Sequence, residues 1–106
     1  MTRIQSKDRA HIVYELTVNG ATYIGCTNVE EQLGVEGSLL RRIAKHWYRL
    51  KDDRRRHWAL YQAIATLPNR DCIGRRIIAL ADSKAAGHRL ETELIAELKP
   101  LLNSDQ

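Results

Sequence analysis

Apolar and polar residues alternate along residues 11–25, and the dipeptide Asn19-Gly20 interrupts the alternation in the middle. Asn-Gly is the dipeptide that best tolerates the two positive φ angles of a type I′ turn, so the stretch is typical of a β-hairpin. A two-residue turn sets the register and pairs Tyr14 with Gly25 and Leu16 with Tyr23. Tyr14, Leu16 and Tyr23 are then on one face. The two tyrosines are either core aromatics or the floor of a site.

A helical period follows in residues 38–50, with Ser38 as the expected N-cap. Arg42 and His46 are four residues apart, so we expect them one above the other at the margin of the apolar stripe. The stripe consists of Leu39, Leu40, Ile43, Trp47 and Leu50.

The remaining pattern predicts a helix, a strand and a helix. The first helix is expected to begin near Arg56 or His57 and to stop before Pro68. The β-branched run that ends near residue 81 is typical of a strand buried by helices on at least one side. A last helix is expected after Asp82 or Ser83, closed by Pro100. The order is therefore β-β-α-α-β-α, in a single domain over residues 11–106 after a flexible lead-in at residues 1–10.

Glu91 lies in an unexpected position on that last helix. At 100° per residue it falls inside the arc formed by the apolar residues, whereas Glu93 and Glu97 fall outside it. The arc consists of Leu90, Leu94, Ile95 and Leu98. A carboxylate on an apolar face is costly unless it is paired or binds a metal. Two interpretations remain: a buried Glu–Arg pair, or a functional site.

Positive charge is concentrated in one part of the chain. The net charge is +4, but residues 39–58 alone carry eight basic and two acidic residues. This distribution favours a surface for a nucleic-acid backbone, the alternative being an ordinary solvated helix. The basic residues are Arg41, Arg42, Lys45, Arg49, Lys51, Arg54, Arg55 and Arg56.

Several functional classes lack support in this sequence. It has no apolar run near 18 residues and no charged-then-apolar amino terminus, and Cys26 and Cys72 lack zinc-motif spacing. No phosphate-cradling glycine motif or nucleophilic serine motif occurs. We therefore expect a cytoplasmic (intracellular) protein without membrane association. A lone carboxylate suits one hard divalent ion, and Glu91, Arg42 and a tyrosine together match the needs of metal-assisted phosphodiester hydrolysis.

Taken together, these segments resemble the GIY-YIG nuclease family over residues 11–103. Tyr23-Ile24-Gly25 matches the second half of the family's name motif, and Ile12-Val13-Tyr14 stands where Gly-Ile-Tyr is usual. Residues 42–46 resemble its Arg-x-x-x-His helix, and residues 60–64 its second helix. The segment from Glu91 to Asn103 resembles its closing helix. Each of these motifs is weak alone, and it is their order and spacing together that carry the resemblance.

The resemblance implies an α/β fold of the α+β type, with a small, mainly antiparallel three-stranded sheet flanked by helices. It also implies a DNA endonuclease in which Glu91 ligates one Mg²⁺ or Mn²⁺ and Arg42 holds the scissile phosphate. Tyr14 would position or deprotonate the attacking water, supported by Tyr23 and His46. Gly25 and Asn103 are then structural motif residues, and His57 joins the basic residues as a DNA contact.

Two departures from the family pattern bear on function. Ile12 replaces a glycine, and the 16 residues between Gly25 and Arg42 form a long connection that would be an insertion for substrate contact. With no additional DNA-binding domain in the sequence, specificity would come from its own loops, a homodimer or a partner protein. The rival interpretations are a catalytically silent nucleic-acid-binding or partner-binding domain, and an RNA-contacting domain in which Glu91 pairs with an arginine.

Overall fold

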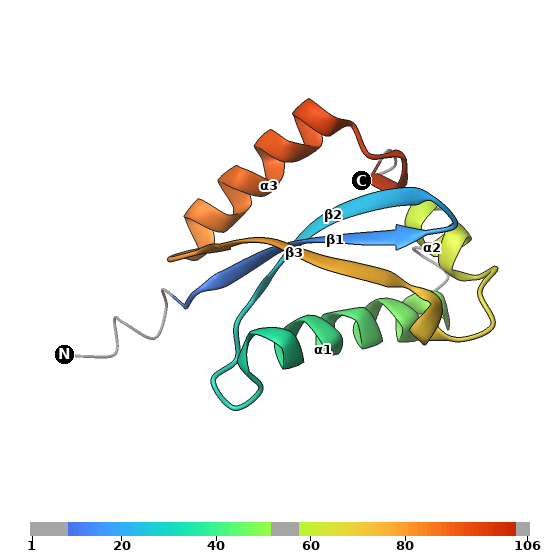
Figure 1. Ribbon diagram of the computed structural model, residues 1–106, viewed down its shortest axis with the longest axis horizontal. Coiled ribbons are helices and arrows are strands. Elements are labelled where there is room, and N and C mark those ends of the chain that lie inside the picture. The colour runs from blue at the N-terminus through green and yellow to red at the C-terminus, as the bar shows by residue number, and fades with distance from the viewer. Residues whose placement is uncertain (1–8, 52–57, 104–106) are drawn as a thin grey trace.

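The computed structural model describes residues 9–51 and 58–103. Three antiparallel strands form one sheet in the order β2-β1-β3, with β1 at His11–Val18, β2 at Ala21–Asn28 and β3 at Gly74–Ala81. Helices α1 and α2 lie on one side of the sheet and α3 on the other (Figure 1). The expected α+β class, element order and antiparallel sheet are confirmed.

The hairpin forms as its turn chemistry predicts. Asn19 and Gly20 have φ angles of 52° and 85°, the left-handed values that a type I′ turn needs. Tyr14 pairs with Gly25 and Leu16 with Tyr23, so the predicted register is confirmed.

Helix α1 begins earlier than expected, and Ser38 is not its N-cap. The helix runs over Gly34–Tyr48, because a short turn after β2 ends at Gly34, whose left-handed φ of 72° starts the helix there. The Ser38 hydroxyl donates to the Gly34 carbonyl at 2.6 Å and accepts from the Glu30 amide at 2.8 Å, holding the turn to the helix. The long connection expected before Arg42 is therefore mostly β2 and α1, and the chain between them spans only residues 29–33.

Helix α2, at Ala59–Ile64, is shorter than predicted. Its expected first residues, Arg56 and His57, lie outside the described residues, and the helix ends at Ile64 rather than near Leu67. The Thr66 and Leu67 amides donate to the carbonyls three residues before them, which tightens the chain into turns before Pro68.

Strand β3 is an edge strand rather than the buried strand that its apolar run predicted. Its residues are exposed or half-buried, and Leu80 is 58% exposed. In the described sheet β3 pairs with β1 alone, and Ile77 and Ile78 are only partly buried where they pack against the two core clusters. The β1–β3 register shifts between Val13 and Tyr14, a bulge beside the first hairpin tyrosine.

Helix α3, at Lys84–Leu98, begins and ends as predicted. Ser83 is its N-cap and accepts from the Ala86 amide at 3.1 Å. Lys99 adopts a left-handed φ of 47°, which ends the helix before Pro100. Leu98 was expected in the apolar arc but is 54% exposed.

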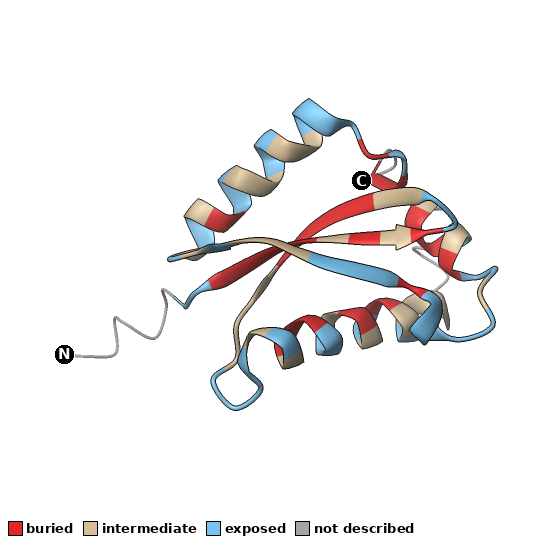
Figure 2. Cartoon of the chain, viewed as in Figure 1, coloured by how far each residue is buried: buried red, intermediate tan, exposed pale blue. Residues whose placement is uncertain are grey.

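Alternation along the hairpin gives the sheet two apolar faces (Figure 2). One face packs Ile12, Tyr14 and Tyr23 against α1 and α2, and the other packs Val13, Ile24 and Cys26 against α3. Ile12 is fully buried and is a core residue.

Both ends of the described chain are tied to the hairpin. The Ala10 carbonyl accepts from the Val29 amide at 2.8 Å, while residues 1–8 of the expected lead-in lie outside the described residues. After α3, a short 3-10 turn, η5, spans Leu101–Asn103. The Asn103 amide accepts from the Ile24 N–H at 2.8 Å and donates to the Ile24 carbonyl at 2.9 Å, so it satisfies the free edge of β2. No described helix is both long enough and apolar enough to cross a membrane.

Candidate functional site

The site is built around Tyr14, whose ring lies over Gly25. A Cβ at Gly25 would be 2.5 Å from the Tyr14 hydroxyl and 2.6 Å from Cζ, so the space above the glycine is filled by Tyr14 itself. The Tyr23 ring is 6.4 Å away, centroid to centroid. The expected pair of co-facial tyrosines is present, and Gly25 has the close-approach role of a motif residue.

His46 connects Tyr14 to a further tyrosine. It is 2% exposed, so its expected place at the margin of the helix stripe is wrong. Its Nε2 is 3.1 Å from the Tyr14 hydroxyl and its Nδ1 is 2.9 Å from the Tyr61 hydroxyl. A neutral imidazole has one donor and one acceptor nitrogen, so one phenol donates to His46 and the other accepts from it. The sequence reasoning did not single out Tyr61, although its hydroxyl on an otherwise apolar helix face needs a partner.

Burial, followed by the charges of Arg42 and Arg49, lowers the pKa of His46 from 6.5 to about 3. The folded protein therefore holds this imidazole neutral at physiological pH. In the unfolded chain the same histidine ionises near its ordinary pKa, so the folding stability depends on pH.

We expect the free energy of unfolding to fall as the pH is lowered from about 6.5 toward 3. Over this window His46 takes up a proton in the unfolded chain but not in the folded chain, and this favours unfolding. Above this window His46 is neutral in both states, so its contribution to the free energy of unfolding is complete. Urea unfolding at a series of pH values measures the effect, and His46→Gln should flatten the pH dependence relative to the wild type. His88→Gln, at an exposed histidine, is the matched control; equal slopes for wild type and His46→Gln would contradict the assignment.

Arg42 lies beside Tyr14 with part of its guanidinium unsatisfied. Burial by itself disfavours the charge, but the phenol groups of Tyr14, Tyr23 and Tyr61 outweigh it, and the pKa of Arg42 is raised. Arg42 Nε is buried without a hydrogen-bond partner, the single such side-chain atom among the residues that the structure describes. Buried donors are normally satisfied, so the unpartnered Nε singles out Arg42 as a candidate functional residue.

Tyr14 is a neutral phenol at physiological pH. Burial raises its pKa, with the neighbouring Tyr23 and the Glu91 charge acting in the same direction, whereas the Arg42 charge and hydrogen bond lower it. The influence of Arg42 on this pKa is smaller than that of burial. With no exposed surface, Tyr14 is also shielded from bulk water.

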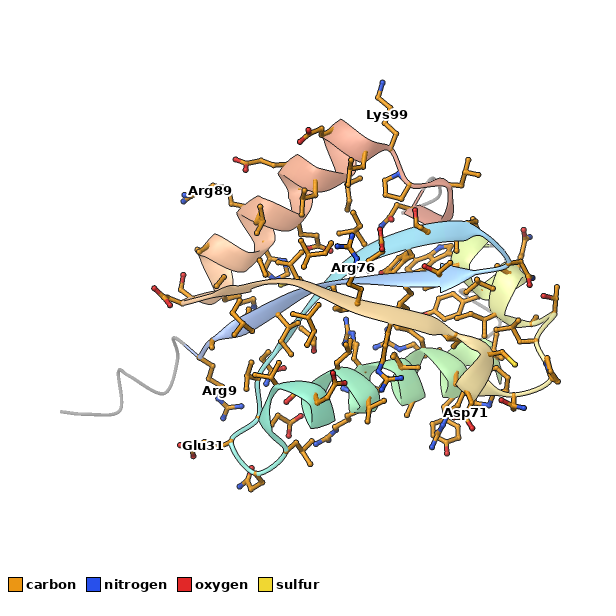
Figure 3. The ribbon with its side chains drawn as sticks, viewed as in Figure 1. Arg9, Glu31, Asp71, Arg76, Arg89 and Lys99 are labelled. Atoms are coloured by element: carbon orange, nitrogen blue, oxygen red, sulfur yellow. The ribbon has the colours of Figure 1, made fainter. Side chains whose placement is uncertain are left out.

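An open pocket of about 410 Å³ lies along the end of β2, where α1 and α3 reach the same strand from opposite faces of the sheet. Arg42 lines it from α1, and His88 and Lys84 line it from α3. Arg9 also lines it and extends on the same side as the start of α1, whereas Arg89 points away from the sheet (Figure 3). A cavity of about 480 Å³ elsewhere is lined by Arg70 and Asp71 among others and contains none of the predicted catalytic residues.

Glu91 has an unexpected pair of neighbours beside this pocket. Its Oε1 is 3.1 Å from His88 Nδ1, and one donor atom each from Cys26, His88 and Glu91 lies within 4.8 Å of the others. The side chain of Glu91 is 21% exposed and its ion-pair partner is His88, so the Glu–Arg pair considered from the sequence does not appear in the described structure. Burial, and then the Glu91 charge, raises the pKa of Cys26 to about 11. Neither Cys26 nor His88 was identified from the sequence, because only the fold brings β2 next to α3.

The predicted DNA-contacting residues are only partly described. Arg41 and Lys45 are exposed on α1, and Arg41 donates to Glu30 at 2.7 Å; Arg49 is half-buried. Lys51 belongs to a 3-10 turn, η2 at Arg49–Lys51. The remaining expected contacts, Arg54, Arg55, Arg56 and His57, lie outside the described residues.

Comparisons of the chain with protein-family models, with curated proteins and with solved structures found no match. The function is therefore argued from the site's own geometry and chemistry.

Proposed function

We propose that this protein is a divalent-metal-dependent DNA endonuclease of the GIY-YIG type. The observation that carries the proposal is the buried, unpartnered Nε of Arg42 beside an open pocket. A phosphate oxygen is the acceptor that a guanidinium fork fits best, and helix α1, whose Arg42 lines the pocket, also carries the exposed Arg41 and Lys45. Anion-binding chemistry and a basic approach surface are what a DNA backbone requires.

A metal ion would be held beside this pocket, where Glu91 lies next to the lining residue His88. The partly buried Glu91 carboxylate, with a histidine nitrogen 3.1 Å away, is the donor that would hold one Mg²⁺ or Mn²⁺. When bound, the ion supplies charge neutralisation at the phosphate and a more acidic water.

The protein's own residues then have separate tasks. Arg42 binds the scissile phosphate and stabilises the charge that develops on it. Tyr14 interacts electrostatically with Arg42 and hydrogen-bonds with His46, and so helps to orient the guanidinium, with Tyr61 completing the network from α2. Tyr23, on the same face as Tyr14, packs with its ring edge-on to His46 and supports this arrangement.

A catalytically silent nucleic-acid-binding or partner-binding domain is the second candidate. The full burial of Tyr14 favours it, because a base that meets no water cannot take a proton from it. Such a domain would bind DNA with a steep salt dependence and would not cleave it with any divalent ion. In either case, target specificity would come from a homodimer or a partner protein.

Nicking of supercoiled plasmid by the purified chain tests the proposal. We expect conversion to the open-circular form with Mg²⁺ or Mn²⁺ and none after EDTA, because the reaction needs the ion at Glu91. A parallel purification from cells that lack the gene controls for contaminating nucleases. DNA binding without nicking under every divalent ion would support the silent domain instead.

A further inference from the structure

Three side chains of different donor type meet between β2 and α3. Cys26 contributes sulfur, His88 a ring nitrogen and Glu91 a carboxylate oxygen, and one atom of each lies within 4.8 Å of the others. In a tetrahedral zinc site with bonds of about 2.0–2.3 Å, ligand atoms are about 3.3–3.7 Å apart. The distance of 3.1 Å from His88 Nδ1 to Glu91 Oε1 is already close to that spacing. Small side-chain rotations therefore bring the three donors onto one ion.

The close contact of α3 with the hairpin depends on Gly87. A Cβ at this position would lie 2.9 Å from the Cβ of His11 and 3.0 Å from Cys26 Sγ, distances that side chains do not tolerate. The glycine is therefore what lets the first turns of α3 approach the strands, which brings His88 and Glu91 near the sulfur. This approach is a tertiary feature, separate from the spacing of His88 and Glu91 on the helix.

We propose that Cys26, His88 and Glu91 form a three-ligand site for a borderline-soft divalent cation, with Zn²⁺ as its best occupant. Thiolate, imidazole and carboxylate are all zinc ligands, and a thiolate and a carboxylate together balance the charge of the ion. On binding, the thiol loses its proton to solvent and the metal–sulfur bond forms, with no change of oxidation state. Three protein ligands leave a fourth position for water or substrate, and His88 and Cys26 both line the open pocket.

The simpler interpretation is an i,i+3 hydrogen-bonded pair of His88 and Glu91 on the surface of α3. This pair alone gives no role to Cys26, whose sulfur belongs to another element and faces the same two side chains. The two interpretations differ in one measurable respect: only a metal site depends on the thiol.

The consequence for activity rests on the proposed function. Because Glu91 belongs to both donor sets, Zn²⁺ and Mg²⁺ compete for it, and a thiolate selects Zn²⁺ strongly. Zinc would then occupy the nuclease site in place of magnesium and inhibit cleavage. Metal binding itself does not require the protein to be a nuclease, so the two proposals can fail separately.

Binding of Co²⁺ to the full, reduced chain tests the site directly. We expect intense tetrahedral cobalt bands together with a thiolate-to-cobalt charge-transfer band in the near ultraviolet, both displaced by one equivalent of Zn²⁺. Cys26→Ser should abolish the charge-transfer band and weaken Zn²⁺ binding, measured by competition with a chromophoric chelator, by about tenfold or more. Cys72→Ser, at the exposed second cysteine, is the matched control and should bind as the wild type does.

Gly87→Ala provides an independent test of the geometry. The variant keeps all three ligand residues and the His88–Glu91 pair, but the added methyl group pushes α3 away from Cys26. Zinc binding should therefore weaken. Circular dichroism checks that the variant remains folded. If it unfolds, His88→Gln, which removes one of the ligands, replaces it in the test. Zinc binding that is equally tight in the wild type, Cys26→Ser and His88→Gln, or octahedral cobalt spectra without sulfur charge transfer, would overturn the site and leave the nuclease proposal standing.

Discussion

Arg42→Lys is expected to lower the rate of plasmid nicking by at least about 100-fold, the size of effect seen when a single charge-stabilising donor is lost at an active site. Lysine keeps the positive charge but has neither the planar fork nor a donor at the place of Nε, the atom that is buried and unpartnered in the structure. Initial rates of supercoiled-plasmid conversion at saturating Mg²⁺ measure the loss.

The neighbouring residue gives a close control for this prediction. Arg41→Lys removes the same functional group one position away, but Arg41 is exposed and pairs with Glu30 rather than with the tyrosines. An exposed ion pair contributes little, and lysine keeps the positive charge that the proposed DNA surface needs at this position, so the rate should remain near that of the wild type. If Arg42→Lys nicks as fast as Arg41→Lys while both variants melt at the same temperature, Arg42 does not hold the reacting phosphate.

Glu91→Gln is expected to abolish Mg²⁺-dependent nicking while leaving the fold intact. The amide keeps the size and the hydrogen-bonding oxygen of the side chain but removes the negative charge that would hold the ion. Because the side chain is 21% exposed and lies at the margin of the core, the melting temperature should change little. Nicking rates over a range of Mg²⁺ concentrations separate weakened ion binding from a loss of chemistry.

Glu93→Gln is the matched control on the same helix, since Glu93 is exposed. It should nick at the wild-type rate. A Glu91→Gln variant that still cleaves at that rate with Mg²⁺ would rule out Glu91 as the metal ligand of a nuclease. The zinc site would still be tested separately, by the cobalt spectra.

Much of the local structure follows from the sequence. The hairpin and its register follow from Asn19-Gly20 and from alternation, because a two-residue turn leaves one pairing with the apolar residues on a common face. The last helix follows from the Ser83 cap and from Pro100. The first helix is placed less well, because Gly34, which allows the early turn, looks like a loop residue when it is considered alone.

The candidate site is predictable only in part. Tyr14, Tyr23, Arg42 and Glu91 were identified as chemistry-bearing residues from face, spacing and resemblance. His46 was placed at a margin because a helical wheel treats its helix as packed on one side only. In the fold, the same side chain is covered by Tyr14 from β1 and Tyr61 from α2, and it becomes a buried neutral imidazole.

The sequence by itself determined the elements, their order, the hairpin register and which residues carry reactive groups, because capping, turn chemistry and periodicity act over a few neighbouring residues. Only the tertiary structure decided the burial of Tyr14, the unpartnered Nε of Arg42 and the meeting of Cys26 with His88 and Glu91. These features depend on how α1 and α3 pack on opposite faces of one twisted sheet. That packing brings together residues more than sixty positions apart, which no local pattern encodes.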